Sequence, residues 1–303
     1  MPNQDGSIGS MRTLYEAMPL VEGMRLTVLV EDSVSMDKPD LIAKHGLSFL
    51  IETCMAGSSP RILMDTGPPP DIALQNANMI DEDLRKVDAI VISHGHYDHA
   101  GGLTEILKHI GRPTPVMAHP KVFNPKFVCK PNLKFIGPEF DQSQVRTAGG
   151  IPLLARNLIK IANGVMTSGE VAREMAFEKT EEFWTVENER FVRDSIIDDQ
   201  ALFINLKDKG LVVITGCAHS GIINTVKHAQ KMTGINDVYA IIGGLHLAKA
   251  DEETIQASIN ELVRINPQSI YPCHCTGSKA IHHLLNSFKD RCKPIQTGDV
   301  IEL

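Results

Sequence analysis

The sequence has no long apolar run and no excess of basic side chains. None of its hydrophobic stretches approaches the ~18 residues that a membrane-spanning helix needs, so we expect no membrane segment. Its 30 basic and 37 acidic residues give a net charge of −7. Because a nucleic-acid backbone favours dense lysine and arginine, we expect no nucleic-acid partner. The first residues lack the basic start and apolar stretch of a secretory signal, so we expect a cytoplasmic protein with reduced cysteines.

Several motifs of well-known enzyme classes are also missing. There is no G-x-x-x-x-G-K-[ST] loop and no G-x-G-x-x-G after a strand, which excludes the common nucleotide-binding loops. No G-x-S-x-G elbow marks a serine hydrolase. What remains is a chain of 303 residues that is 43% hydrophobic and 22% charged, an ordinary globular composition.

Short apolar strands alternate with helical patterns along most of the chain. We interpret residues 1–24 as an irregular lead-in and 25–303 as one domain. Between about 121 and 199 the pattern weakens, and we expect an elaboration packed over the core, with the acidic residues 178–189 facing solvent. The remaining order indicates an α/β (mixed α+β) fold of sheets covered by helices. We expect strands at 24–31, 46–53, 61–65, 89–93, 116–118, 201–206, 211–215, 238–242 and 269–271, and helices at 103–110, 222–232, 252–265 and 279–288.

The densest chemical signal directly follows the apolar strand at 89–93. Three histidines and one aspartate lie within six residues, and Gly95 permits a sharp backbone bend between them. Neutral imidazole and carboxylate are the nitrogen and oxygen ligands that Zn²⁺ prefers. The sequence therefore predicts a metal site formed by His94, His96, Asp98 and His99.

This spacing, H-x-H-x-D-H, resembles the signature of the metallo-β-lactamase superfamily. The resemblance extends along almost the whole chain, because Asp65, Cys217 and His274 each follow an expected strand, as the matching family positions do. It implies a four-layer αββα sandwich with the metals at one edge. It also implies that Asp65 supports the metal loop from behind.

The resemblance implies two divalent metal ions, with Zn²⁺ expected and Fe or Mn also compatible with the ligands. It gives His94 and His96 to one ion, and Asp98, His99 and His274 to the other. Asp98 would also orient the nucleophile or carry a proton during turnover.

One position departs from the family pattern. The third histidine normally precedes the strand before Cys217, yet no histidine lies between His119 and Cys217. His219 is the natural substitute. Cys217 occupies the place of a bridging aspartate, and two interpretations stay open: a thiolate that binds Zn²⁺ at ~2.3 Å, or a small buried thiol.

Two residues are candidates for substrate contact. His246 follows a glycine pair at a strand end, where it can reach the metal edge or serve as a hydrogen-bonded structural residue. Thr276 opens the last helix, whose N-terminus can bind an anionic group or simply be capped.

The stretches 216–221, 243–247 and 272–277 resemble a subgroup of metal-dependent hydrolases. Some members carry the name of an archaeal pterin enzyme, the 7,8-dihydropterin-6-methyl-4-(β-D-ribofuranosyl)-aminobenzene 5′-phosphate synthase. We therefore expect a hydrolase whose metal-bound hydroxide attacks an ester, lactone, amide or phosphoester of a small molecule. That substrate would be anionic or pterin-like. The alternatives are a pterin-group transferase, a metal-dependent nuclease, which the acidic charge disfavours, and a non-catalytic metal-bearing sensor.

Overall fold

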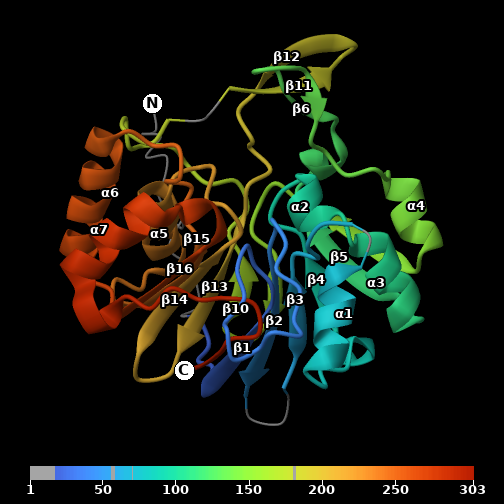
Figure 1. Ribbon diagram of the computed structural model, residues 1–303. Helices are drawn as coiled ribbons and strands as arrows, with labels where there is room; N and C mark the ends of the chain where they lie inside the picture. Colours follow the sequence, from blue (N-terminus) through green and yellow to red (C-terminus); the bar gives the residue numbers. More distant parts are fainter. Residues whose placement is uncertain (1–17, 56–58, 70, 180–181) are drawn as a thin grey trace, which may run out of the picture.

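Two β-sheets pack face to face, and helices cover the outer side of each (Figure 1). The computed structural model describes residues 18–55, 59–69, 71–179 and 182–303. This arrangement confirms the expected mixed α/β, αββα fold. Within the described residues, no helix is both long and apolar enough to span a membrane.

The first sheet has seven strands in the order β17-β1-β2-β3-β4-β5-β8. Pairing is antiparallel from β17 to β3 and parallel from β3 to β8. Consequently β1, β3 and β4 run in the same direction and end at the same edge. The strands are β1 (Gly23–Val30), β2 (Ser48–Cys54), β3 (Arg61–Met64), β4 (Ala89–Val91), β5 (Thr114–Ala118), β8 (Gly150–Leu154) and β17 (Val300–Glu302).

The second sheet has six strands in the order β16-β15-β14-β13-β10-β9. Its strands β14, β15 and β16 are parallel, so their carboxyl ends also share one edge. The strands are β9 (Lys160–Ala162), β10 (Val165–Thr167), β13 (Ala201–Leu206), β14 (Gly210–Thr215), β15 (Val238–Gly244) and β16 (Ser269–Cys273).

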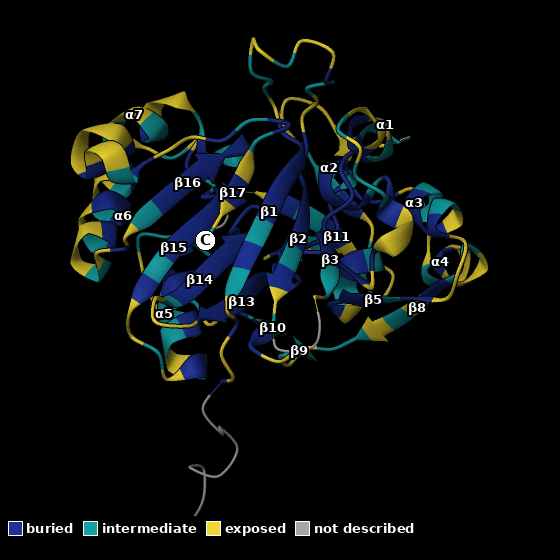
Figure 2. Cartoon of the chain, turned by 90° about the horizontal axis from the view of Figure 1, so that it is seen from below, coloured by how far each residue is buried: buried dark blue, intermediate teal, exposed yellow. Residues whose placement is uncertain are grey.

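Three apolar layers hold the sandwich together. Buried side chains of both sheets, such as Phe49 and Ile242, form the middle layer. The outer layers lie under the helices, whose exposed faces contrast with the buried strands in Figure 2. The helices are α1 (Ile72–Met79), α2 (Tyr97–Ala100), α3 (Leu103–Ile110) and α4 (Gln142–Thr147) beside the first sheet, and α5 (Ile222–Thr233), α6 (Glu252–Ile265) and α7 (Ser278–Phe288) beside the second.

Residues 121–199 do more than cover the core. Strand β8 completes the first sheet, and β9 with β10 extend the second. Four other strands of this segment form a small third sheet, which we call the flap, at the top of Figure 1. Its strands are too short for a clear period in the sequence. The flap consists of β6 (Lys126–Val128), β7 (Lys134–Phe135), β11 (Phe183–Glu187) and β12 (Arg190–Asp194).

The backbone is unusual where the strands of both sheets end. Within three residues after the carboxyl ends of β3, β14, β15 and β16, one residue other than glycine in each case has a positive φ angle: Asp65 at 59°, Ala218 at 55°, His246 at 53° and His274 at 48°. Such conformations cost free energy and cluster at functional sites. The edge at which β3, β14, β15 and β16 end is therefore the candidate site.

Candidate metal centre

Three histidines converge on one point of this edge. His94 and His96 leave the loop after β4, and His219 leaves the loop after β14. The Nε2 atom of His94 lies 2.9 Å from Nδ1 of His96 and 3.2 Å from Nε2 of His219. All three side chains are buried. The sequence places these residues up to 125 positions apart, and the two sheets bring them together.

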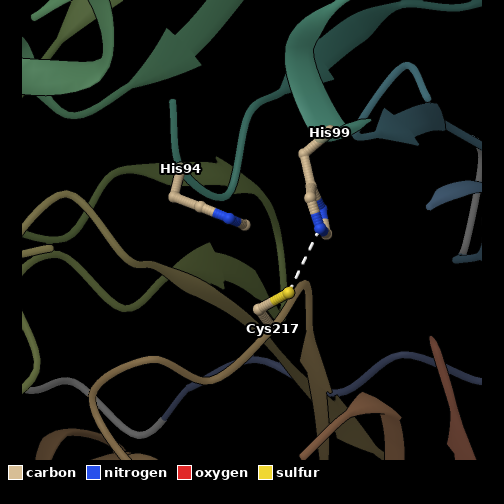
Figure 3. Close-up of side chains that lie close together, drawn as sticks. All are labelled: His94, His99 and Cys217. Carbon is tan, nitrogen blue, oxygen red and sulfur yellow. Dashed lines mark hydrogen bonds between the residues drawn. The ribbon is translucent and has the colours of Figure 1, made fainter. Parts of the chain in front are cut away.

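A second group lies directly beside the first. The Nε2 atom of His99 is 3.2 Å from Nε2 of His274 and 3.2 Å from Sγ of Cys217. An Asp98 oxygen lies 3.7 Å from His99 and 3.5 Å from His274. In Figure 3, Cys217 is joined to His99, and the His94 ring faces the same space. The ring centres of His94 and His99 are 4.2 Å apart, so Cys217 and these rings connect the two groups.

Asp65 orients one histidine of each group from behind. It accepts hydrogen bonds from Nδ1 of His99 and from Oγ of Ser93, both at 2.7 Å. Since the Ser93 hydroxyl proton is used there, Nδ1 of His94 donates to Ser93 Oγ at 2.9 Å. Both imidazoles therefore keep the lone pair on Nε2, the atom that faces the centre. A carboxylate behind a ligating histidine is the usual way to fix this tautomer.

His274 is oriented by residues that the sequence analysis missed. Its Nδ1 donates to Asp32 at 2.7 Å, and its backbone N–H donates to Glu31 at 2.8 Å. His45 donates to the other Asp32 oxygen at 3.0 Å and lies 3.5 Å from Asp98. The sequence did contain a signal for Glu31 and Asp32: they directly follow β1, just as the other site residues follow strands. His45 lies outside every strand and helix, and no pattern marks it.

A buried lysine joins the flap to the metal loop. The Lys126 ammonium lies 2.8 Å from Asp198 and 3.0 Å from Asp194, and all three side chains are buried. Asp198 also accepts a hydrogen bond from the backbone N–H of Gly95 at 2.8 Å. The bend between the first two histidines of the motif is therefore held by the segment that the sequence analysis treated as an elaboration.

Burial keeps the histidines of the first group neutral. It lowers the pKa of His94 and of His219 well below the usual value, and neighbouring histidines lower both further. The pKa of His96 falls to about 3 by the same burial. Burial opposes ionisation of Asp98, but His99 and His274 hold the pKa of its carboxyl well below the usual range.

The donor set fits divalent metal ions. Ring nitrogens and a thiol lie within 4.8 Å of one another in the groups His94–His96–His219 and His94–His99–Cys217. The Asp98 carboxylate lies beside the second of these groups, 3.7 Å from His99. This is the nitrogen, oxygen and sulfur chemistry of zinc-type sites. Burial raises the pKa of the Cys217 thiol. A thiol that binds such an ion is deprotonated, because the charge of the ion reverses the effect of burial.

A cavity of about 360 Å³ opens above the centre. Its floor includes Asp98, Cys217, His219 and His274, and the flap contributes Phe183. The Phe183 ring packs 5.1 Å from His96 and 5.3 Å from His219, centre to centre, so the flap also positions metal-facing rings.

The two expected substrate contacts have different positions. His246 lines the cavity, with its ring 4.1 Å from that of His219. Thr276 does not line it: its side chain is fully buried, and Oγ1 accepts a hydrogen bond from the backbone N–H of Leu245 at 3.0 Å. The Thr276 hydroxyl therefore links two loops and forms no part of the cavity wall.

Comparisons with known proteins agree with this geometry. A model of the metallo-β-lactamase superfamily matches residues 42–150. A curated protein of Methanocaldococcus jannaschii, named 7,8-dihydropterin-6-methyl-4-(β-D-ribofuranosyl)-aminobenzene-5′-phosphate synthase, is 36% identical over 288 residues, which are 93% of this chain and 97% of that protein. The chain belongs to the metallo-β-lactamase superfamily.

Solved structures of this superfamily share the fold. Tm1679, described as a metal-dependent hydrolase of the β-lactamase superfamily, is 26% identical with a TM-score of 0.77, covering 92% of this chain and 99% of that one. The metallo-β-lactamase fold protein YhfI from Bacillus subtilis is 13% identical with a TM-score of 0.56, covering 93% of this chain and 100% of that one. The second likeness concerns the fold alone.

Proposed function

We propose that this superfamily member is an enzyme with a two-metal centre. One divalent ion, Zn²⁺ by its ligands, would be held by His94, His96 and His219. The other would be held by Asp98, His99 and His274, with Cys217 between the two. The observation that carries this proposal is the convergence of the two buried groups on the floor of one cavity. When bound, such ions stabilise negative charge that develops on an oxygen atom of the substrate or leaving group.

The first candidate reaction is transfer of a pterin-methyl group to an aromatic amine. The M. jannaschii relative supports it, because its name describes a dihydropterin-methyl group joined to an aminobenzene. The amine lone pair would form the new C–N bond while the C–O bond to a diphosphate breaks. The electron pair of that bond leaves with the diphosphate, and the amine proton passes to solvent.

The residues of this chain have separate tasks in such a reaction. Asp65 and Asp32 hold the tautomers of the ligating histidines by the hydrogen bonds described above. Lys134 and Lys249 lie at the cavity wall, where cationic side chains attract an anionic substrate. Phe183 closes one side of the cavity and limits the access of water.

Hydrolysis, the reaction expected from the sequence, is the second candidate. The description of Tm1679 as a metal-dependent hydrolase favours it. Hydroxide would attack the acyl carbon or the phosphorus of an ester, lactone, amide or phosphoester, and the bond from that atom to the leaving oxygen or nitrogen would break. Asp98, which belongs to the second metal-binding group and lines the cavity, would then orient the water or carry its proton.

Both candidates are tested by one incubation of the metal-loaded protein. A 7,8-dihydropterin 6-methyl diphosphate is supplied with and without 4-aminobenzoate, and mass spectrometry separates the coupled product from the hydrolysed pterin. We expect coupling that requires the amine and is lost in His219→Ala, with metal content falling in parallel. His282→Ala, on the exposed side of α7, serves as the control and should retain both. Full metal content with neither product would contradict the proposal.

A further inference from the structure

A second cleft adjoins the metal cavity. It has a volume of about 220 Å³ and shares His219, His246 and Lys249 with the cavity above the metal centre. Its other walls come from the residues before the flap strand β11, the loop after β15 and the first turn of α6. These walls include Phe177, Glu178, Leu245, Leu247, Ala250 and Thr254.

The interior of the cleft is apolar and its rim is cationic. Phe177, Leu245 and Leu247 supply the apolar wall, while exposed Lys179 and Lys249 lie at the opening. In another protein an apolar cavity of about 150 Å³ holds one benzene ring. The cleft therefore has room for one substituted aromatic ring, and its rim favours a negatively charged substituent.

The carboxylates of Glu178 and Asp251, which line the cleft, each accept hydrogen bonds from backbone N–H groups at the start of a helix. Glu178 accepts hydrogen bonds from the backbone N–H groups of Ile223 and Asn224 at 2.7 and 2.8 Å, at the start of α5. Asp251 accepts one from the backbone N–H of Thr254 at 2.8 Å, at the start of α6. The positive end of each helix offsets the negative charge, so these groups do not prevent an anion from binding at the rim.

The cleft and the metal cavity adjoin at the imidazole rings of His219 and His246. The rings of His219 and His246 lie 4.1 Å apart, and both line both spaces. His219 also belongs to the first metal-binding group. A molecule in the cleft and a substrate above the metals would therefore lie next to one another, where the two spaces share these side chains. Hydrolysis requires no second organic site, whereas group transfer requires two that meet.

We propose that this cleft binds the acceptor, an aromatic amine with an anionic substituent, while the metal cavity holds the group that is transferred. This inference rests on the proposed transfer reaction and gives its second substrate a location. His246, which lines both spaces, would then position the acceptor where the two sites meet.

A matched pair of substitutions tests the location. Ala250→Trp fills only the cleft, and Val128→Trp fills only the metal cavity. With 4-aminobenzoate as the probe, calorimetry on the metal-loaded protein should give binding that is at least about tenfold weaker in Ala250→Trp and unchanged in Val128→Trp. Phe177→Ala, which removes a wall without adding bulk, should also weaken it. Equal metal content in all variants excludes an effect through the centre.

The outcomes separate this inference from the proposed function. Absence of probe binding to the unchanged protein, or loss only in Val128→Trp, would overturn the cleft as the acceptor site. Coupling with an unaltered KM for the amine in Ala250→Trp would also overturn it while leaving the transferase intact. If 4-aminobenzoate binding depends on Ala250 and Phe177 but no coupled product forms, the cleft remains an aromatic-amine site and the transfer reaction is rejected.

Discussion

His99 and Asp65 form a buried hydrogen bond of 2.7 Å that connects the two sides of the metal centre. The same carboxylate accepts hydrogen bonds from the backbone N–H and the hydroxyl of Ser93, each at 2.7 Å. Through Ser93 it also fixes the tautomer of His94. One side chain that faces away from the cavity therefore sets the lone pairs of a histidine in each metal-binding group.

Replacing Asp65 with asparagine should weaken metal binding without removing a ligand. Oδ2 of Asp65 accepts from both Ser93 Oγ and His99 Nδ1, whereas Oδ1 accepts from the Ser93 backbone N–H. An amide nitrogen cannot accept a hydrogen bond, so in place of Oδ2 it removes the acceptor that fixes the tautomers of His99 and His94, and in place of Oδ1 it leaves the Ser93 N–H without its partner. Changes behind metal ligands typically reduce affinity about 10–100-fold, and we expect a loss in that range in competition with a chelator. Asp81→Asn is a matched control, because Asp81 has nearly the same φ of 60° but is exposed. Equal affinity in Asp65→Asn and the control would contradict the prediction.

Cobalt substitution tests whether the sulfur of Cys217 binds metal. If its sulfur joins the two metal-binding groups, the cobalt-substituted protein should show sulfur-to-cobalt charge-transfer absorption that Cys217→Ser loses, together with part of the metal content. Serine keeps the shape but is a poorer ligand for a zinc-type ion. Cys54→Ser, at an exposed position on the end of β2, should leave the spectrum unchanged. A spectrum that survives in Cys217→Ser would leave Cys217 as a buried thiol.

The regular elements were predictable because their patterns are local. The strand at 201–206 and the helices at 103–110 and 252–265 have the expected bounds, since each shows a clear apolar period with an end signal. Gly111, for example, ends α3 in the left-handed conformation at a φ of 67°. The flap lacks such a pattern, because its strands span two to five residues between prolines, glycines and charges.

The candidate site was predictable where ligands follow strands in a recognisable motif. His94, His99, Cys217, His219 and His274 converge at this edge, and their role as metal ligands stays a prediction. Asp198 was not predicted because its partner at Gly95 lies 103 residues away and no motif marks it. Asp32 follows a strand, but its partner His274 lies 242 residues away, and His45 lies outside every strand and helix of the described residues. The solvent-facing position expected for Glu178 was wrong as well. Its carboxylate is largely buried and holds the start of α5.

The buried ion pairs of Lys126 should make a large contribution to stability. Lys126→Met leaves Asp194 and Asp198 buried without their cation, and removal of one partner from such a group costs about 3–5 kcal/mol. We expect a loss of this size in the free energy of unfolding measured with urea. Lys108→Met removes an exposed pair with Glu105 and should cost at most about 1 kcal/mol. Adding Asp198→Asn to Lys126→Met should restore part of the loss, and similar effects of the two lysine substitutions would contradict the prediction.

Glu178 should make stability fall as the pH rises. Burial raises the pKa of its carboxyl from 4.5 to about 7, although the N–H groups of Ile223 and Asn224 oppose that shift. The folded protein therefore holds a proton that the unfolded chain releases, so the contribution to stability is complete below about pH 4.5 and is lost as the pH passes 7. One pKa unit corresponds to about 1.4 kcal/mol, and solvent at the cleft should reduce the total change to about 1–2 kcal/mol.

Glu178→Gln removes this titration and so separates it from the titration of the other groups of the protein. The free energy of unfolding of the unchanged protein, measured relative to this variant, should decline between pH 5 and pH 8. Glu253→Gln, at an exposed position in the first turn of α6, should give a difference that does not vary with pH. A constant difference for Glu178→Gln as well would mean that the carboxylate is ionised throughout, held in that state by the N–H groups at the start of α5.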